Sequence, residues 1–183
     1  MITYVKGDLL ESDCNLIIHG CNCFHSMSSG IAKQIKEWYP LAYQTDLQSS
    51  IYGDKNKLGK FTHCIVPHKN FGFDLVVVNG YTQYKYGRDP NIVYADYNAI
   101  RSVMEAVKFY FPNNKIGFPL IGCGLARGDR NIVEQILNEV FNDKEVFLYE
   151  LEQSQSVNQV EIDLKQKYKS HFDALYKDLL NKN

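Results

Sequence analysis

The alternation of two hydrophobic periodicities is the feature that most constrains the fold of this chain. Short apolar runs typical of β-strands occupy residues 2–6, 15–19, 61–66, 75–81, 115–119 and 145–150. Between them, apolar side chains recur at helical spacing in stripes that start at Ile31, Tyr97 and Ile132. Strands that alternate with amphipathic helices predict an α/β fold, in which helices cover both faces of a mostly parallel, mixed sheet.

Capping residues and prolines mark the predicted helix boundaries. Ser28 or Ser29 is a suitable N-cap for the helix near Ile31, and Pro40 is expected to end that helix. Pro112 is expected to end the second helix in the same way. The sequence therefore predicts a helix that begins near Ile31 and ends before Pro40.

Size and composition predict one domain with an appendage. A chain of 183 residues with 45% hydrophobic side chains has enough apolar material for a single core. We assign residues 1–151 to that domain. Residues 152–156 are polar and predict a linker, and the apolar stripe beyond them predicts a C-terminal amphipathic helix that ends the chain at residue 183. This helix would dock on its own domain or on a second copy, which would give a homodimer.

Charge and hydrophobic patterning disfavour nucleic acid and membranes as partners. Twenty Lys and Arg residues balance 21 Asp and Glu residues, so no global positive field would attract nucleic acid. No apolar run reaches the roughly 18 residues of a membrane span. The first residues lack a signal-peptide pattern, so we expect a cytoplasmic protein that does not bind a membrane.

Metal and disulfide chemistry are not predicted either. The five cysteines are an odd number, which favours free thiols. Cys21 and Cys23 lie near His19 and His25, but the spacing is not that of a zinc site. We therefore expect no metal and no cofactor.

Two loops are candidates for holding a phosphate. Residues 20–30 connect a predicted strand to the helix near Ile31, and residues 122–129 lead into the helix at Ile132. Small residues let backbone N–H groups approach an anion, and a helix N-terminus adds a favourable potential. Each loop alone would equally be an ordinary glycine-containing turn. Neither has the spacing of a P-loop or of a dinucleotide fingerprint, which disfavours kinases, GTPases and dehydrogenases.

Four segments in order resemble the macro domain family. They are residues 6–10, residues 19–23 with 27–32, residues 80–84 and residues 119–125. The resemblance covers about residues 1–151 and is strongest to phage and bacterial members related to ADP-ribose 1''-phosphate phosphatases. It implies a three-layer α/β/α domain that binds ADP-ribose or an ADP-ribose derivative.

The resemblance also implies roles for individual residues. Asp8 would accept a hydrogen bond from the adenine amino group, with a backbone N–H from Leu9, and Asn22 would contact the distal ribose. Tyr149 would flank the adenine. Backbone amides would surround the diphosphate, and they belong to Ser28, Ser29, Gly30, Ile31, Gly122, Cys123, Gly124, Leu125 and Ala126.

Local alternatives exist for the side chains among these. Asp8 follows Gly7 and is equally a turn residue. Asn22 would also cap its own loop. Tyr149 alternates with Phe147 and would equally be part of the core.

His25 and Asp129 are the candidate catalytic residues. A histidine exchanges protons near neutral pH, and a carboxylate orients it or activates water. Relatives that use a lysine adduct carry lysine and aspartate where this chain has Gln83 and Ala126, so that mechanism is disfavoured. The alternatives are an exposed loop position for His25 and an N-cap for Asp129.

Other side chains in these loops have weaker claims. Arg127 or Arg130 would balance the charge of a terminal phosphate, or would form a solvated surface. Cys23 and Cys123 would be nucleophiles or, as small thiols beside packed strands usually are, core residues.

The leading functional prediction is a hydrolase that converts ADP-ribose 1''-phosphate to ADP-ribose and phosphate. One alternative is a non-catalytic binder of ADP-ribose or a related signalling nucleotide. Another is a hydrolase that removes ADP-ribose from modified protein or nucleic acid.

Overall fold

The computed structural model describes residues 1–151. The predicted linker and amphipathic helix at 152–183, and the homodimer contact assigned to them, lie outside the described residues. No helix within residues 1–151 combines the length and the apolar character that a membrane span requires.

The sheet is mixed and mostly parallel, as predicted. Its strands follow the order β1-β6-β5-β2-β4-β3, and in the described part of the chain only the pairing of β3 with β4 is antiparallel. The strands are β1 (Ile2–Lys6), β2 (Leu16–Asn22), β3 (Phe61–Pro67), β4 (Asp74–Gln83), β5 (Ile116–Pro119) and β6 (Val146–Glu150).

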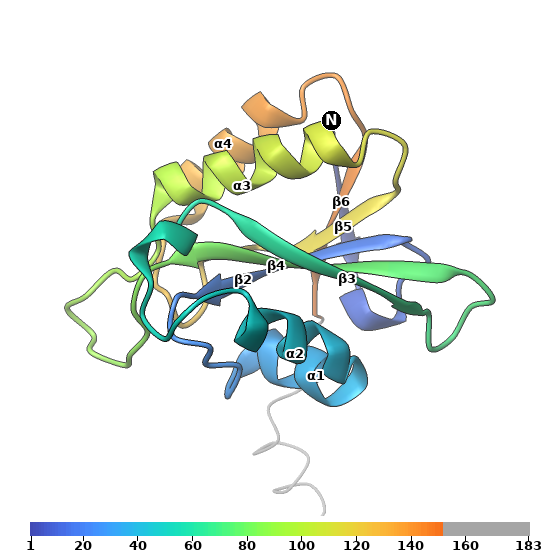
Figure 1. Ribbon diagram of the computed structural model, residues 1–183. Helices are drawn as coiled ribbons and strands as arrows, with labels where there is room; N and C mark the ends of the chain where they lie inside the picture. Colours follow the sequence, from blue (N-terminus) through green and yellow to red (C-terminus); the bar gives the residue numbers. More distant parts are fainter. Residues whose placement is uncertain (152–183) are drawn as a thin grey trace, which may run out of the picture. The chain divides into compact units, whose positions relative to one another are not determined.

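Helices cover both faces of this sheet, which confirms the three-layer α/β/α architecture. Figure 1 shows α3 and α4 on one face and α1 and α2 on the other. Their bounds are α1 (Gly30–Trp38), α2 (Pro40–Gln48), α3 (Tyr97–Tyr110) and α4 (Arg130–Val140), and two short 3₁₀ helices are η1 (Leu9–Glu11) and η2 (Lys55–Lys57).

Helix α2 was not predicted from the sequence. Helix α1 ends at Trp38 as expected, but Pro40 then occupies the first turn of α2. Proline suits that position because its missing N–H would have no helical acceptor there. Pro40 therefore marks the end of one helix and the beginning of the next.

Two separate apolar cores lie on the two faces of the sheet. Neighbouring residues of a strand point to opposite faces, so Ile18 packs into the core beneath α3 and α4, whereas Ile17 packs into the core beneath α1 and α2. Both side chains are almost fully buried. The continuous apolar run at residues 16–18 is thus explained by a strand that is covered on both sides.

A buried polar network connects α2 to the sheet. The Asp46 carboxylate is 1% exposed, and its Oδ1 accepts hydrogen bonds from Lys57 Nζ at 2.8 Å and from the Tyr81 hydroxyl at 2.9 Å. Tyr81 also meets Thr62 Oγ1 at 3.0 Å, and Thr62 accepts from Asn79 Nδ2 at 3.1 Å. The ammonium group of Lys57 is likewise buried, which pairs it with Asp46 inside the protein.

His19 extends this network and makes the stability depend on pH. Its Nε2 lies 2.7 Å from Asn79 Oδ1, and burial lowers the pKa of His19 from 6.5 to about 4. Between these values the unfolded chain binds a proton that the folded chain does not. Acidification from pH 7 to pH 4 is therefore expected to lower the free energy of unfolding by about 3 kcal/mol.

Urea denaturation across this pH range measures the effect. His19→Gln keeps an N–H donor for Asn79 but does not titrate, so its unfolding free energy should depend less on pH. Equal pH dependence in both proteins would show that His19 is not responsible.

Candidate functional site

A crevice arises where loops leave the sheet in opposite directions. Strands β2 and β5 are parallel neighbours, so their carboxyl ends lie at one edge of the sheet. The loop after β2 leads to α1 on one face, and the loop after β5 leads to α4 on the other face. Ligands of α/β proteins bind at such a divergence.

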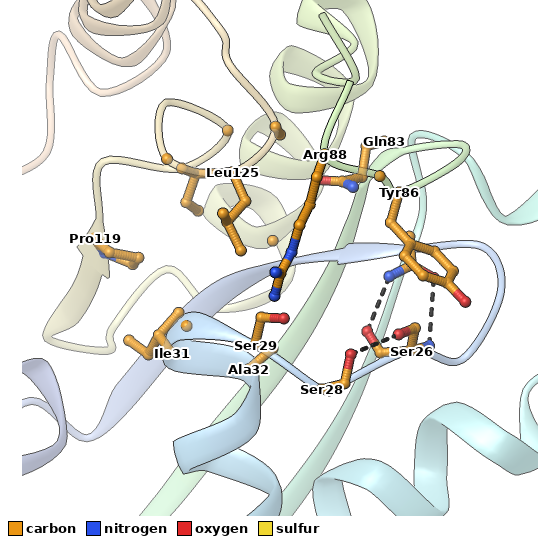
Figure 2. A pocket seen from close by; sticks show the side chains of 18 of the residues that line it. Ser26, Ser28, Ser29, Ile31, Ala32, Gln83, Tyr86, Arg88, Pro119 and Leu125 are labelled. Carbon is orange, nitrogen blue, oxygen red and sulfur yellow. Dashed lines mark hydrogen bonds between the residues drawn. The ribbon is translucent and has the colours of Figure 1, made fainter. Parts of the chain in front are cut away.

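A cavity of about 450 Å³ occupies this position (Figure 2). This volume lies within the roughly 300–1,000 Å³ of small-molecule sites. Three loops contribute to its walls, namely those after β2, β4 and β5. The lining residues are Gly20, Asn22, Ser26, Ser28, Ser29, Gly30, Ile31, Ala32, Gln83, Tyr86, Gly87, Arg88, Pro119, Leu120, Ile121, Gly122, Gly124, Leu125 and Ala126.

The N-terminus of α1 offers free backbone donors to the cavity. Its N-cap Ser29 makes no side-chain capping bond. Within residues 1–151, the N–H groups of Gly30, Ile31 and Ala32 have no hydrogen-bond acceptor. Because the helix dipole adds positive potential here, an anion would be stabilised.

The loop after β5 offers donors through a turn and not through a helix end. Gly122 adopts a left-handed φ of 77°, which favours glycine, and a Cβ there would make a tight contact of 3.1 Å with Ile100 Cδ1. In the described part of the chain, the N–H groups of Gly124, Leu125 and Ala126 find no acceptor. The N–H of Cys123, by contrast, donates to the Leu120 carbonyl.

Asp129 occupies the helix end that the sequence suggested for an anion. Its carboxylate caps α4, accepting from the N–H groups of Asn131 at 2.7 Å and Ile132 at 3.4 Å. This loop does lead into a helix N-terminus, but Asp129 already accepts from the N–H groups of Asn131 and Ile132, so these two donors are not available to an anion. The alternative interpretation of Asp129 as an N-cap is confirmed.

The cavity has an apolar end and a polar end. Figure 2 shows Ile31 and Pro119 toward one end, and Gln83, Tyr86 and Ser26 toward the other. An elongated ligand with an apolar ring and a hydroxylated sugar at opposite ends would match this difference.

Asn22 lines the polar end and also shapes its own loop. Its Oδ1 accepts from the N–H groups of Phe24 at 2.9 Å and Ser26 at 3.3 Å, and its Nδ2 donates to the Ser26 carbonyl at 2.9 Å. The capping role is thus present, and the side chain remains at the cavity wall.

His25 does not line the cavity. Its backbone is left-handed with a φ of 51°, and its ring is buried, so the exposed position considered as an alternative is wrong. Nε2 lies 3.2 Å from the Ser50 carbonyl, and Nδ1 lies 3.1 Å from Asp46 Oδ1 and 3.2 Å from Lys57 Nζ. Both ring nitrogens thus contact protein groups. The catalytic role of His25 and Asp129 stays a prediction, with neither side chain at the cavity wall.

The residues assigned to adenine do not line the cavity. The Asp8 carboxylate accepts from the Leu10 N–H at 2.9 Å and caps η1, and Leu9 is buried. Tyr149 packs against the core beneath α1 and α2, and burial raises its pKa to about 12. Tyr149 is also paired with the cavity residue Pro119 across the sheet. Their adenine contacts stay predictions.

The weaker candidates contact other parts of the protein. Arg130 pairs with Glu134 and Glu150, and Arg127 is exposed outside the cavity wall. Burial raises the pKa of the Cys123 thiol to about 11 and also raises that of Cys23, so both are protonated at neutral pH and poor nucleophiles.

Tyr86 and Arg88 are among the cavity residues that sequence reasoning missed. They lie on the loop after β4, where the sequence of residues 87–90 predicts a loop and nothing more. No periodicity or motif marks them. The available signal was topological, because this loop follows a strand that neighbours β2 at the same sheet edge.

The lining residues include no carboxylate, imidazole or thiol. Within residues 1–151, no group of three His, Cys, Asp or Glu side chains is arranged to hold a metal ion. The five cysteines are free thiols. The polar groups of the site are therefore backbone amides, side-chain hydroxyls, the side-chain amides of Asn22 and Gln83, and the guanidinium group of Arg88.

The fold and the cavity define a three-layer α/β/α ligand-binding domain. The chain is 32% identical over 161 residues to an uncharacterised 17.5 kDa protein of Enterobacteria phage T4, covering 83% of this chain and 97% of that protein. It is 37% identical over 78 residues, 42% of each chain, to an ADP-ribose 1''-phosphate phosphatase of Saccharomyces cerevisiae. Among solved structures, the macrodomain of Mycobacterium tuberculosis DarG matches with a TM-score of 0.63 and 24% identity, over 81% of this chain and 97% of that one.

No model of a known protein family matches the sequence. The near-complete match to the phage protein, together with the shared fold, nonetheless shows the relationship. The chain belongs to the macro domain family.

Proposed function

We propose that the cavity binds ADP-ribose. The main support is a pair of backbone N–H clusters that line one cavity. One cluster lies at the start of α1 and the other follows Gly122, and the N–H groups of both have no acceptor within residues 1–151. A diphosphate between them would accept hydrogen bonds from both. The adenine would lie toward Ile31 and Pro119, and the distal ribose toward Asn22.

The similarity to proteins named for an ADP-ribose derivative supports this ligand. The matched yeast relative is an ADP-ribose 1''-phosphate phosphatase. Its matched segment is only part of either chain, so it supports the ligand class more strongly than the reaction.

Isothermal titration of the full chain with ADP-ribose tests the proposal. We expect saturable binding at one site, and an unfolding free energy that rises by about 2.7 kcal/mol when free ligand is 100 times Kd. Adenosine, which lacks the diphosphate, should bind more weakly. No heat and no stabilisation with ADP-ribose would contradict the proposal.

A second candidate is removal of the 1''-phosphate, favoured by the similarity to named phosphatases. Incubation with ADP-ribose 1''-phosphate, followed by phosphate detection, tests it beside His25→Ala and Asp129→Ala. Turnover that survives both substitutions would exclude these residues from the mechanism. Binding without product would favour a non-catalytic binder. Release of ADP-ribose from modified protein or nucleic acid would favour a hydrolase that removes ADP-ribose from such targets.

A further inference from the structure

Arg88 places a cation inside the cavity. Figure 2 shows its side chain extending into the cavity, with the guanidinium group between Leu125 and Ser29. These two residues belong to the loops after β5 and β2, which carry the free N–H groups. The guanidinium group thus lies where the two sets of donors approach each other.

The loop that carries Arg88 is tied to the cavity wall. The N–H groups of Tyr94 and Ala95 donate to the Ala126 carbonyl at 2.8 and 3.1 Å. A Cβ at Gly87 would lie 2.1 Å from the Tyr94 hydroxyl oxygen, so the Tyr94 side chain packs directly against the backbone of Gly87, immediately before Arg88. The segment that follows Arg88 is therefore anchored to the loop after β5, which forms part of the cavity wall.

No acidic side chain among residues 1–151 neutralises this cation. Within residues 1–151, Arg88 forms no ion pair, whereas Arg101 pairs with Glu139 and Arg130 pairs with Glu134. The cavity wall contains no carboxylate. An uncompensated guanidinium group in a concave site attracts an anion, and its planar donors match two phosphate oxygens.

We propose that Arg88 clamps the diphosphate of the bound ligand against the two amide-bearing loops. This inference rests on the proposed function and adds a specificity residue to it. The protein would prefer ligands with a central diphosphate over neutral nucleosides. The diphosphate would lie where the guanidinium group and both sets of N–H groups approach one another.

The test compares Arg88→Gln with Lys85→Gln in the full chain. Lys85 is exposed on the same loop but does not line the cavity, so its substitution makes the same charge change elsewhere. We expect Arg88→Gln to weaken ADP-ribose binding about tenfold and to reduce the salt dependence of the affinity. Lys85→Gln should change neither, and Arg88→Lys should be intermediate.

The outcomes separate the two proposals. If the unaltered chain does not bind ADP-ribose, the proposed function fails. If it binds and Arg88→Gln binds equally well with the same salt dependence, only the clamp is overturned. Tighter binding by Arg88→Gln would also overturn it, because the guanidinium group would then be blocking the cavity. An unchanged melting temperature would confirm that both glutamine variants are folded.

Discussion

Replacing Asp46 by asparagine is expected to lower the free energy of unfolding by about 3–5 kcal/mol. Its carboxylate is 1% exposed and is the ion-pair partner of Lys57, which is 5% exposed. Asparagine has nearly the same shape but no charge. The buried ammonium group would then lack its counter-ion, and the Tyr81 hydroxyl would lose a charged acceptor. Urea denaturation at pH 7 measures the change.

Two further variants make this result specific. Asp46→Asn combined with Lys57→Met removes both charges, so the double variant should be more stable than Asp46→Asn alone. Asp13→Asn breaks the ion pair with Lys115, in which the Asp13 side chain is 57% exposed and the Lys115 side chain is 37% exposed. This substitution should lower the free energy of unfolding by less than about 1 kcal/mol. A loss below about 1 kcal/mol for Asp46→Asn would show that the buried pair is not important for stability.

Replacing Gly124 by glutamate is expected to weaken ADP-ribose binding by about 100-fold or more. A Cβ at Gly124 would meet no atom within 4 Å, and its φ is not left-handed, so the fold should tolerate a side chain there. The residue lines the cavity beside the free N–H groups after Gly122. A carboxylate at this position would repel a diphosphate, and like charges in contact cost several kcal/mol.

Gly72→Glu is the matched control for this experiment. Gly72 lies in the turn between β3 and β4, and a Cβ there also meets nothing within 4 Å. It does not line the cavity, so ADP-ribose affinity should be unchanged. Equal affinity in the two variants would mean that the ligand does not occupy the cavity beside Gly124.

The sheet was predictable from the sequence, but α2 was not. Each strand has a local signal, because apolar runs of limited length are bounded by turn residues. Helix α2 has no clear apolar stripe, since its buried residues include Asp46 where an apolar side chain would be expected. Asp46 can be buried on the inward face of α2 because Lys57 and Tyr81, which come from other elements, donate hydrogen bonds to its carboxylate.

The candidate site was predictable in part. The loops after β2 and β5 carry small residues, and these do line the cavity. Side-chain direction was not predictable, because the ring of His25 is held by Asp46 and Lys57, and α2 supplies the first of these. Arg88 was missed because a loop sequence does not reveal which side chain enters a cavity formed by two other loops.

The pairing of the first strand with the last has a consequence for the order of folding. Among the described strands, β1 pairs only with β6, in a register that joins Ile2 to Val146, and β6 separates it from β5. During synthesis β1 emerges first and remains without a neighbour until nearly the whole domain has been translated. Such long-range pairing slows folding. Completion of the sheet therefore awaits the synthesis of β6.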